Sequence, residues 1–285
     1  MLHIFPGLIP PIPASKSASV STDLTTARMK QLPDIPVDKE KCIIQDMTVV
    51  TTDTLLVANH SKKCVQLVDS RKGGVLSEVQ LQDEPGSMCL TGRNTAAVTM
   101  TGKKIQMVQV KDNTLTLGRV LTVSKDIRGI TSRGNTLVVS YDSPPWLEVI
   151  SMEGKILRQF HMTGKTQHFE SPFFMCTTPG ETILISDIGT GTITKVDESL
   201  NILQTFTSPL LKYPRGITAV TEDQILVCSS KNHSILLLQP STNTMSILLG
   251  RDDGIWSIHS MAYCPGQKKV YVANRNTDTI QVYQI

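Results

Sequence analysis

Long hydrophobic runs, closely spaced cysteines and a strong charge bias are all missing from this sequence of 285 residues. No run approaches the ~18 apolar residues that a membrane-spanning helix needs. The net charge of +3 falls short of the strongly basic balance of a dedicated nucleic-acid-binding protein, and DNA is not an expected partner. With 40% hydrophobic and 19% charged residues, the composition is that of an ordinary globular protein with a sizeable core.

The cysteines do not form a zinc-binding pattern. No Cys-x-x-Cys pair occurs, and each cysteine lies in or beside an apolar run: Cys42, Cys64, Cys89, Cys176, Cys228 and Cys264. We therefore predict free, buried thiols, which fit a reducing compartment. Cytoplasmic localisation, with no membrane association, is the expectation.

Motifs of common enzyme classes are also missing. The sequence has no Gly-x-Ser-x-Gly, no His-Glu-x-x-His, no P-loop and no Gly-x-Gly-x-x-Gly before a helix. Its six histidines do not pair at metal-ligand spacing. We predict no catalytic residues, no metal ligands and no cofactor.

The N-terminus is rich in proline and is not a signal peptide. Four prolines interrupt Met1–Val20, which lacks both a positively charged start and an unbroken apolar core. We predict that residues 1–20 form a flexible Pro-rich leader.

A short hairpin pattern is present and repeats along the chain. Asp53–Asp69 combines two strand-like runs with a polar turn at Asn59–Lys63. Similar segments begin at Asn94, Asn135, Glu181, Asp223 and Lys268. Repetition of one supersecondary unit decides the fold more strongly than any single residue does.

The period of the repeat indicates a β-propeller. The position that opens each unit is Met47, Met88, Ile130, Met175, Ile217 and Met261, with steps of 41 to 45 residues. Such a period, with about four short strands per unit, is typical of a propeller blade. A single domain over 21–285 is predicted, with blades near 42–82, 83–124, 125–166, 167–209, 210–250 and 251–285. A pair of β-sandwiches, the other all-β architecture considered, accounts poorly for six equal repeats.

The last unit ends at Ile285, directly after its third strand. A blade without its fourth strand leaves an open sheet edge. The strand-compatible segment 21–35 can supply the missing strand and close the ring. The predicted fold is therefore an all-β, six-bladed propeller closed by an N-terminal strand.

The repeats resemble NHL repeats. Tyr213-Pro214-Arg215-Gly216-Ile217 and Arg128-Gly129-Ile130 match the Pro-x-Gly-Ile opener. Val57-Ala58-Asn59-His60 with Val65-Gln66-Leu67, and Val272-Ala273-Asn274 with Ile280-Gln281-Val282, match the body of the repeat. The resemblance spans about 42–285, and the second and fourth units retain little of it.

By this pattern the chain is similar to the C-terminal propellers of tripartite-motif (TRIM) proteins. The resemblance implies recognition of a protein substrate or of RNA, with ubiquitin ligase activity carried by RING and B-box domains elsewhere. This sequence has no Cys/His zinc array and no long heptad repeat, so it encodes no ligase activity. It is then either a separate propeller or a fragment of a longer TRIM protein.

One face of the predicted ring gathers basic and aromatic residues. Turns between second and third strands, and linkers between blades, lie on the same face, which we call the linker face. Its candidate binding residues are Lys62, Lys63, Lys103, Lys104, Arg128, Trp146, Lys212, Tyr213, Arg215, Lys231, His233, Trp256 and Arg275. Aromatic and arginine side chains on one exposed face are typical of protein-binding hot spots and of base-stacking surfaces.

Three functions are compatible with these patterns. The first is non-catalytic recognition of protein partners, as in TRIM–NHL substrate binding. The second is single-stranded RNA binding on the basic face, which would weaken steeply with salt. The third is a calcium-dependent lactonase or esterase that uses Asp126, Asp187, Asn59 and Asn274, since calcium needs several oxygen ligands at one point. Acidic residues do not recur at one blade position, which argues against the third.

Overall fold

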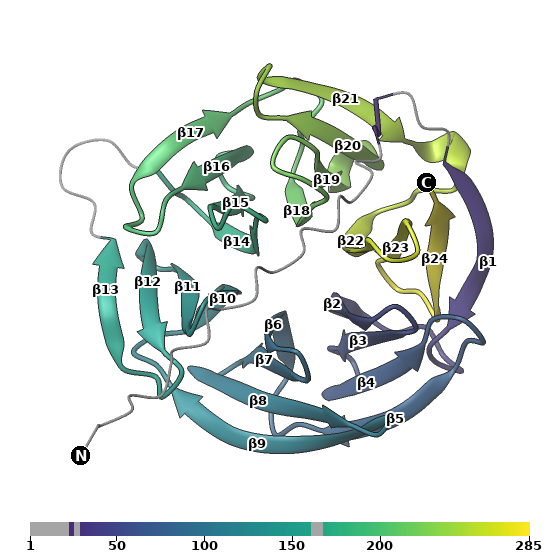
Figure 1. The fold of residues 1–285 in the computed structure, drawn as a ribbon, viewed down its shortest axis with the longest axis horizontal. Helices are drawn as coiled ribbons and strands as arrows, with labels where there is room; N and C mark the ends of the chain where they lie inside the picture. The colour runs from purple at the N-terminus through teal and green to yellow at the C-terminus, as the bar shows by residue number, and fades with distance from the viewer. Residues whose placement is uncertain (1–22, 26–28, 161–167) are drawn as a thin grey trace, which may run out of the picture.

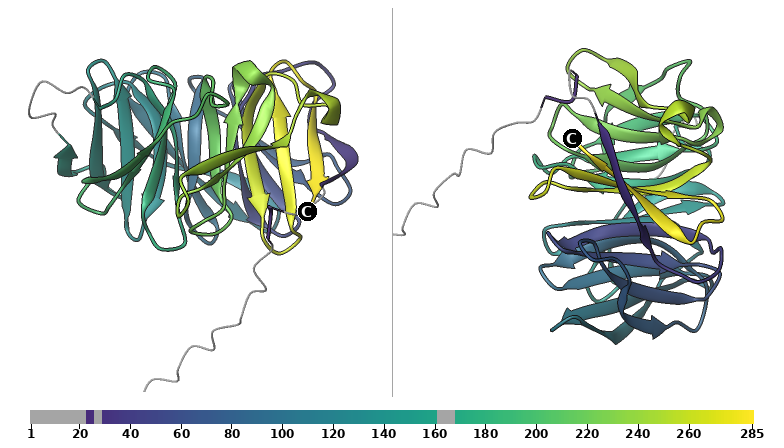
Figure 2. Two further views of the ribbon diagram at one scale, coloured as in Figure 1. Left: turned by 90° about the horizontal axis from the view of Figure 1, so that it is seen from above. Right: turned by 90° about the vertical axis from the view of Figure 1, so that its right-hand side faces the viewer.

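Six four-stranded antiparallel sheets surround a central axis in the computed structural model (Figure 1). The structure describes residues 23–25, 29–160 and 168–285, so the predicted leader lies outside the described residues. Side views show that the strands cross the thickness of the ring (Figure 2). The predicted six-bladed propeller, closed by an N-terminal strand, is confirmed.

Blades one to three follow the chain from the axis outwards. Blade one contains β2 (Ile44–Thr51), β3 (Thr54–Asn59), β4 (Cys64–Asp69) and β5 (Val75–Gln80). Blade two contains β6 (Pro85–Gly92), β7 (Thr95–Met100), β8 (Lys104–Lys111) and β9 (Thr114–Thr122). Blade three contains β10 (Ile127–Arg133), β11 (Thr136–Asp142), β12 (Pro145–Ser151) and β13 (Ile156–Phe160).

Blades four to six complete the ring, with two short 3-10 helices at loops. Blade four contains β14 (Pro172–Thr177), β15 (Ile183–Asp187), β16 (Thr192–Val196) and β17 (Ile202–Phe206). Blade five contains β18 (Pro214–Ala219), β19 (Ile225–Ser229), η1 (Ser230–Asn232), β20 (Ser234–Gln239) and β21 (Thr244–Leu249). After η2 (Arg251–Asp253), blade six contains β22 (Ile258–Cys264), β23 (Lys269–Asn274), β24 (Thr279–Gln284) and β1 (Lys30–Pro36).

The core lies between neighbouring blades. Every residue of β3, β15 and β19 is buried, because both faces of these strands are covered by adjacent sheets. This explains why the second strands read as continuous apolar runs and do not alternate with polar residues. Six hydrophobic clusters fill the gaps between blades.

The closing strand begins later than predicted. The expected segment was 21–35, whereas β1 spans Lys30–Pro36 and pairs antiparallel with β24. Before β1, residues 23–25 form a local turn in which Asp23 accepts hydrogen bonds from the backbone N–H and the hydroxyl of Thr25. β1 is therefore the fourth strand of blade six.

Two prolines lie on this closing strand. Pro33 falls where the register with β24 shifts, and Pro36 ends the strand. Proline is tolerated on edge strands because its missing N–H leaves no ladder partner unsatisfied on the solvent side. The same feature discourages another chain from pairing with the open edge.

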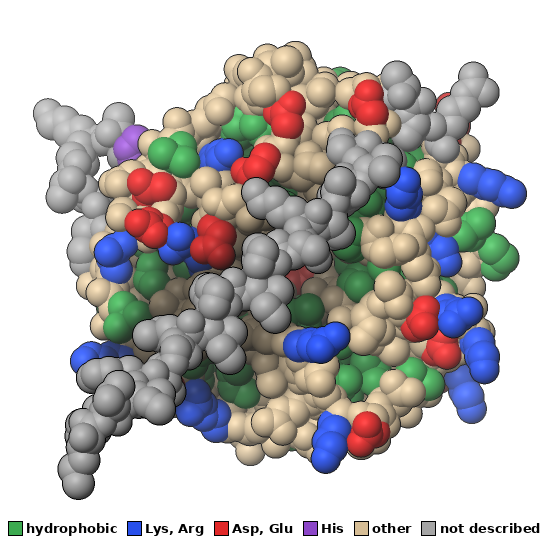
Figure 3. Space-filling model, in the orientation of Figure 1, with side chains coloured by type: hydrophobic (Ala, Val, Ile, Leu, Met, Phe, Trp, Pro, Cys, Tyr) green, Lys and Arg blue, Asp and Glu red, His purple; other side chains and the backbone are tan. Residues whose placement is uncertain are grey.

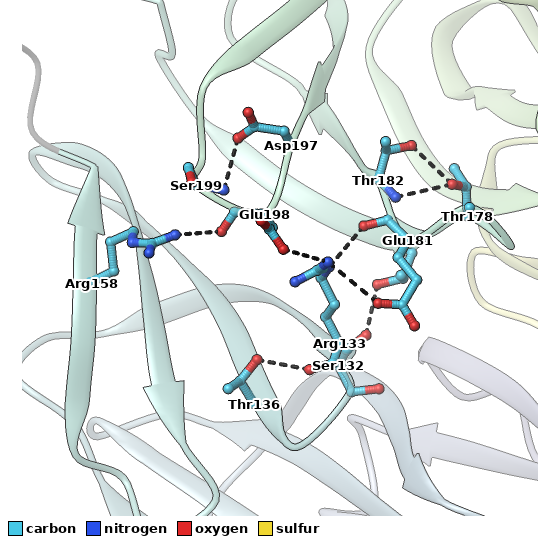
Figure 4. Close-up of polar contacts among 12 residues, drawn as sticks. Ser132, Arg133, Thr136, Arg158, Thr178, Glu181, Thr182, Asp197, Glu198 and Ser199 are labelled. Carbon is cyan, nitrogen blue, oxygen red and sulfur yellow. Dashed lines mark hydrogen bonds and ion pairs between the residues drawn. The ribbon is translucent and has the colours of Figure 1, made fainter.

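On the face opposite the linker face, turns join first to second strands and third to fourth strands; we call it the hairpin face. There, Arg133 of blade three lies 2.9 Å from a carboxylate oxygen of Glu198 and also contacts Glu181 (Figure 4). The Arg158 Nη1 donates to the Glu198 carbonyl at 2.8 Å. These contacts join blade three to blade four.

The predicted free thiols are confirmed, but their predicted burial is partly wrong. All six cysteines are unpaired, and Cys89 and Cys176 are only half-buried, because they line the central channel at the edge of the clusters between blades. Burial raises the pKa of the Cys42 thiol to about 11. Within the described part of the chain, no helix has the length and apolar character needed to span a membrane.

Candidate binding site on the linker face

The inner strand of every blade contains a β-bulge close to the linker face. In each case the register with the second strand shifts after the first paired residue. Bulges bend a strand and redirect a side chain, and they are common next to functional sites. The residues at the start of these bulges form an axis ring: Gln45, Gly86, Arg128, Phe173, Arg215 and His259.

Contacts across the ring show that these side chains converge on the axis. The guanidinium carbons of Arg128 and Arg215 lie 5.8 and 5.9 Å from the centre of the Phe173 ring. Gln45 and Phe173 both line one cavity of ≈ 260 Å³ with Arg128. The ring therefore forms the mouth of the central channel.

Arg215 is a half-buried cation held by neutral groups. Its Nη1 donates to the His259 Nε2 at 2.7 Å, and its guanidinium carbon lies 5.3 Å from the centre of the Tyr213 ring. Burial lowers the pKa of Arg215. Among the described residues, no carboxylate forms an ion pair with it.

His259 is buried and uncharged. Burial, followed by the charges of Arg215, Arg275 and His60, lowers its pKa to about 3. Because Nε2 accepts the hydrogen bond from Arg215, the proton of the neutral ring is assigned to Nδ1. His259 thus positions the guanidinium without adding charge.

We expect His259 to make folding sensitive to mild acid. The unfolded histidine takes up a proton near pH 6.5, whereas the folded one does not until about 3, so falling pH favours the unfolded state. Between pH 7.5 and 5, protonation of His259 in the unfolded state lowers the free energy of unfolding by about 2 kcal/mol. Urea titrations of wild type and His259→Gln at both pH values measure it. An equal loss in both proteins would contradict the prediction.

An aromatic patch lies beside the ring, at the linkers that enter blades five and six. Tyr213 is 37% exposed and Trp256 is 53% exposed. Lys231 lies 5.1 Å from the Tyr213 ring centre, and the Arg251 guanidinium carbon lies 4.6 Å from that of Trp256. We define the patch as Tyr213, Lys231, His233, Arg251 and Trp256.

His233 fixes one side of this patch. Its Nδ1 accepts a hydrogen bond from the Ser257 backbone N–H at 2.8 Å, and its ring centre lies 5.4 Å from that of Trp256. Burial, with a smaller effect from Arg251, lowers the pKa of His233. The backbone therefore holds the His233 ring, and Trp256 packs against it, which reduces the entropy lost when a ligand binds.

The second tryptophan has a different environment. Trp146 packs partly against the core between blades two and three, with its ring centre 5.4 Å from that of Tyr141. Lys125 lies 4.0 Å above the Trp146 ring. Trp146 is on the linker face as predicted, but it is less exposed than Trp256.

Strand topology places all the predicted binding residues on the linker face, yet several predicted cations are paired with carboxylates. The pairs, 2.7–2.9 Å long, are Lys62–Asp38, Lys63–Glu84, Lys104–Asp83 and Arg128–Asp142. Lys103, Lys212, Lys231 and Arg275 form no such pair with a described residue. The face is therefore not a continuous positive track.

The residues proposed for a calcium site do not converge. Asn59, Asp187 and Asn274 end second strands, outside the axis ring. The Asp187 carboxylate accepts four backbone N–H groups of its own blade, and Asn59 and Asn274 bond neighbouring side chains. Within the described residues, no group of three or more His, Cys, Asp or Glu side chains could hold a metal.

The other end of the channel opens on the hairpin face as a cavity of ≈ 260 Å³ lined by all six inner strands. Asp46 lies in its wall and is only 8% exposed. Charges of both signs are mixed around this face, as the space-filling view shows (Figure 3). Among the described residues, the aromatic side chains that count as exposed are Tyr213 and Trp256, and both belong to the patch on the linker face.

The residues predicted from the sequence did not include Asp46, Phe173, Arg251 or His259. A signal for two of them exists, because every member of the axis ring lies two positions before the repeated Met or Ile that opens a blade. Comparing that column across the units places Phe173 and His259 beside Arg128 and Arg215. In each blade the bulge inserts one extra residue into the inner strand, and this turns the residues at these equivalent positions towards the axis.

No family model and no curated protein matches the chain, so the similarity to NHL repeats remains a prediction. A Bacteroides thetaiotaomicron protein of unknown function superposes with a TM-score of 0.71 at 13% identity, covering 88% of this chain and 72% of that one. A streptogramin B lyase gives 0.64 at 13% identity, covering 90% and 87%. The β-propeller domain of Myceliophteria thermophila Cps50 (Swd1) gives 0.62 at 13% identity, covering 85% and 83%. At such identities these neighbours show the propeller fold alone, which hosts many functions.

Proposed function

We propose that this propeller is a non-catalytic recognition module that binds a protein partner on its linker face. The observation that carries the proposal is the aromatic patch, where Tyr213 and Trp256 are exposed and held by cations. Tyrosine, tryptophan and arginine are the residues most enriched in protein-binding hot spots. A propeller fold is compatible with a binding or scaffolding role, and the patch gives that role a location.

The ion pairs favour a protein over single-stranded RNA. RNA binding needs a groove of uncompensated positive charge along the backbone, with aromatic side chains that stack on successive bases. Here four of the predicted cations are neutralised by carboxylates, and Trp146 is partly packed into the core. An exposed patch of mixed polar and aromatic character suits a protein surface better.

The similarity to TRIM propellers extends this proposal. In that setting the propeller selects a cytoplasmic substrate, and a ligase domain or subunit outside this chain attaches ubiquitin. The proposed role of this chain is then selection of the partner, without chemistry of its own.

The proposal is tested by quantitative affinity capture with the purified chain. We expect Tyr213→Ser/Trp256→Ser to reduce recovery of the specific partner by about tenfold or more, because two buried anchors are removed from the interface. Nuclease treatment of the extract separates direct binding from binding through RNA.

The matched control removes equally exposed apolar side chains elsewhere. Leu203 and Ile247 lie on the outer strands β17 and β21 and are 53% and 57% exposed. Leu203→Ser/Ile247→Ser is expected to leave recovery unchanged. Equal recovery by the patch variant and the wild type, or loss of all partners after nuclease treatment, would overturn the proposal.

A further inference from the structure

We propose that the channel mouth on the linker face binds a carboxylate group of the protein partner, with Arg215 and Arg275 as its cationic ligands. This inference rests on the proposed function and specifies the chemistry of the partner. The site lies on the side of the axis formed by blades five and six, next to the aromatic patch.

The first support is the missing counterion of Arg215. A charged group removed from water is costly unless it is paired. Among the described residues, this guanidinium contacts the neutral His259 ring and the rings of Phe173 and Tyr213, and no carboxylate pairs with it. A carboxylate from a partner would supply the pairing that the chain itself lacks.

The second support is the charge around it. Arg275, on the turn between β23 and β24, is exposed, and its backbone N–H donates to the carbonyl of Ser257 at 3.0 Å, two residues before His259. After burial, the charge of Arg275 contributes to the lowered pKa of both Arg215 and His259. Neither Arg215 nor Arg275 forms an ion pair with a described acidic residue. Two cations without a carboxylate partner in the described chain, at one side of the channel mouth, attract an approaching anion.

Acidic groups on the opposite side of the mouth define where the site ends. Glu84 and Asp126 line the cavity that contains Arg128. Glu84 is held by Lys63, and Arg128 is held by Asp142. An incoming anion is therefore directed away from blades two and three and towards Arg215.

The geometry of Arg215 suits a carboxylate. A guanidinium that stacks on aromatic rings keeps its N–H edge available for the two oxygens of a planar carboxylate. The nearby exposed Trp256 and Tyr213 can then contact apolar groups that flank the acidic residue in the partner. An acidic side chain or a C-terminal carboxylate has this chemistry.

The test uses fluorescence anisotropy with labelled hexaglutamate and, as the matched uncharged probe, hexaglutamine. We expect hexaglutamate to bind the wild type with higher affinity, and Arg215→Gln and Arg275→Gln each to weaken it by about tenfold. Arg215→Lys keeps the positive charge but loses the planar N–H donors of the guanidinium. Its affinity for hexaglutamate should therefore lie between those of the wild type and Arg215→Gln. Arg71→Gln on the hairpin face is the charge-matched control and should bind like the wild type.

Arg275 is exposed, so Arg275→Gln is expected to fold. It therefore tests the inference even if Arg215→Gln unfolds the protein. Equal affinity for the two peptides, or unchanged affinity in both variants, would overturn the inference. Tighter binding of a short oligouridylate that depends on Arg215 would also overturn it, in favour of nucleic acid. If hexaglutamate binding fails while capture still depends on Trp256, the inference fails and the proposed function stands.

Discussion

Asp46→Ala is expected to lower the free energy of unfolding by about 3 kcal/mol, because it leaves buried donors without an acceptor. The Asp46 carboxylate accepts the backbone N–H groups of Met47 and Met88 at 2.9 and 2.8 Å. It also accepts the hydroxyls of Ser87 and Ser260 at 2.9 and 2.8 Å. Urea unfolding followed by circular dichroism measures the change.

The size of this effect comes from the position of Asp46 in the ring. Ser87 belongs to blade two and Ser260 to blade six, so one carboxylate on blade one joins both of its neighbours at the axis. Blade six also contains the β1–β24 pairing that closes the ring. Loss of Asp46 therefore weakens an inter-blade contact on either side of blade one.

Three further variants separate hydrogen bonding from charge. Burial raises the pKa of Asp46, so the ionised group bears a desolvation cost that its donors offset. Asp46→Asn keeps the shape of the side chain but replaces one acceptor oxygen by an N–H₂ group that faces a backbone N–H. It should therefore lower the free energy of unfolding by less than Asp46→Ala does. Ser87→Ala and Ser260→Ala should each cost about 1 kcal/mol. An Asp46→Ala protein within about 0.5 kcal/mol of wild type would contradict the assigned role.

The fold was predictable because its signals are repeated and local. Apolar second strands such as β3 and β19 recur at a nearly constant spacing, and each repetition makes the assignment more secure. The position of the closing strand was less predictable. Its pairing with β24 depends on a partner almost the whole chain away, which no local pattern reveals.

The binding surface was only partly predictable for a related reason. Strand order alone assigns Tyr213, Arg215 and Trp256 to one face. Which lysines are neutralised depends on ion pairs between separate loops, such as Lys62 with Asp38. The convergence of Phe173 and His259 on Arg215 depends on bulge geometry, which no single repeat reveals.

The closing strand gives the second large effect. Ile35→Ala is expected to destabilise the protein by about 3 kcal/mol, as usual for an isoleucine truncated in a packed core. Ile35 is 4% exposed, faces Ile280 across the β1–β24 pair, and packs in the cluster between blades one and six. Asp34→Ala, an exposed neighbour on the same strand, should have almost no effect and is the matched control.

The strands in which hydrogen exchange increases distinguish the β1–β24 pairing, the seam that closes the ring, from the other blades. Leu249 is buried on β21, the fourth strand of blade five, but β21 is joined to its blade through the chain. β1 is held to β24 only by pairing and packing, so it can separate while the other blades stay intact. Hydrogen exchange should therefore rise first in β24 for Ile35→Ala, and not for Leu249→Ala at equal overall destabilisation. A uniform rise across all blades in both variants would mean that the seam opens only when the whole ring unfolds.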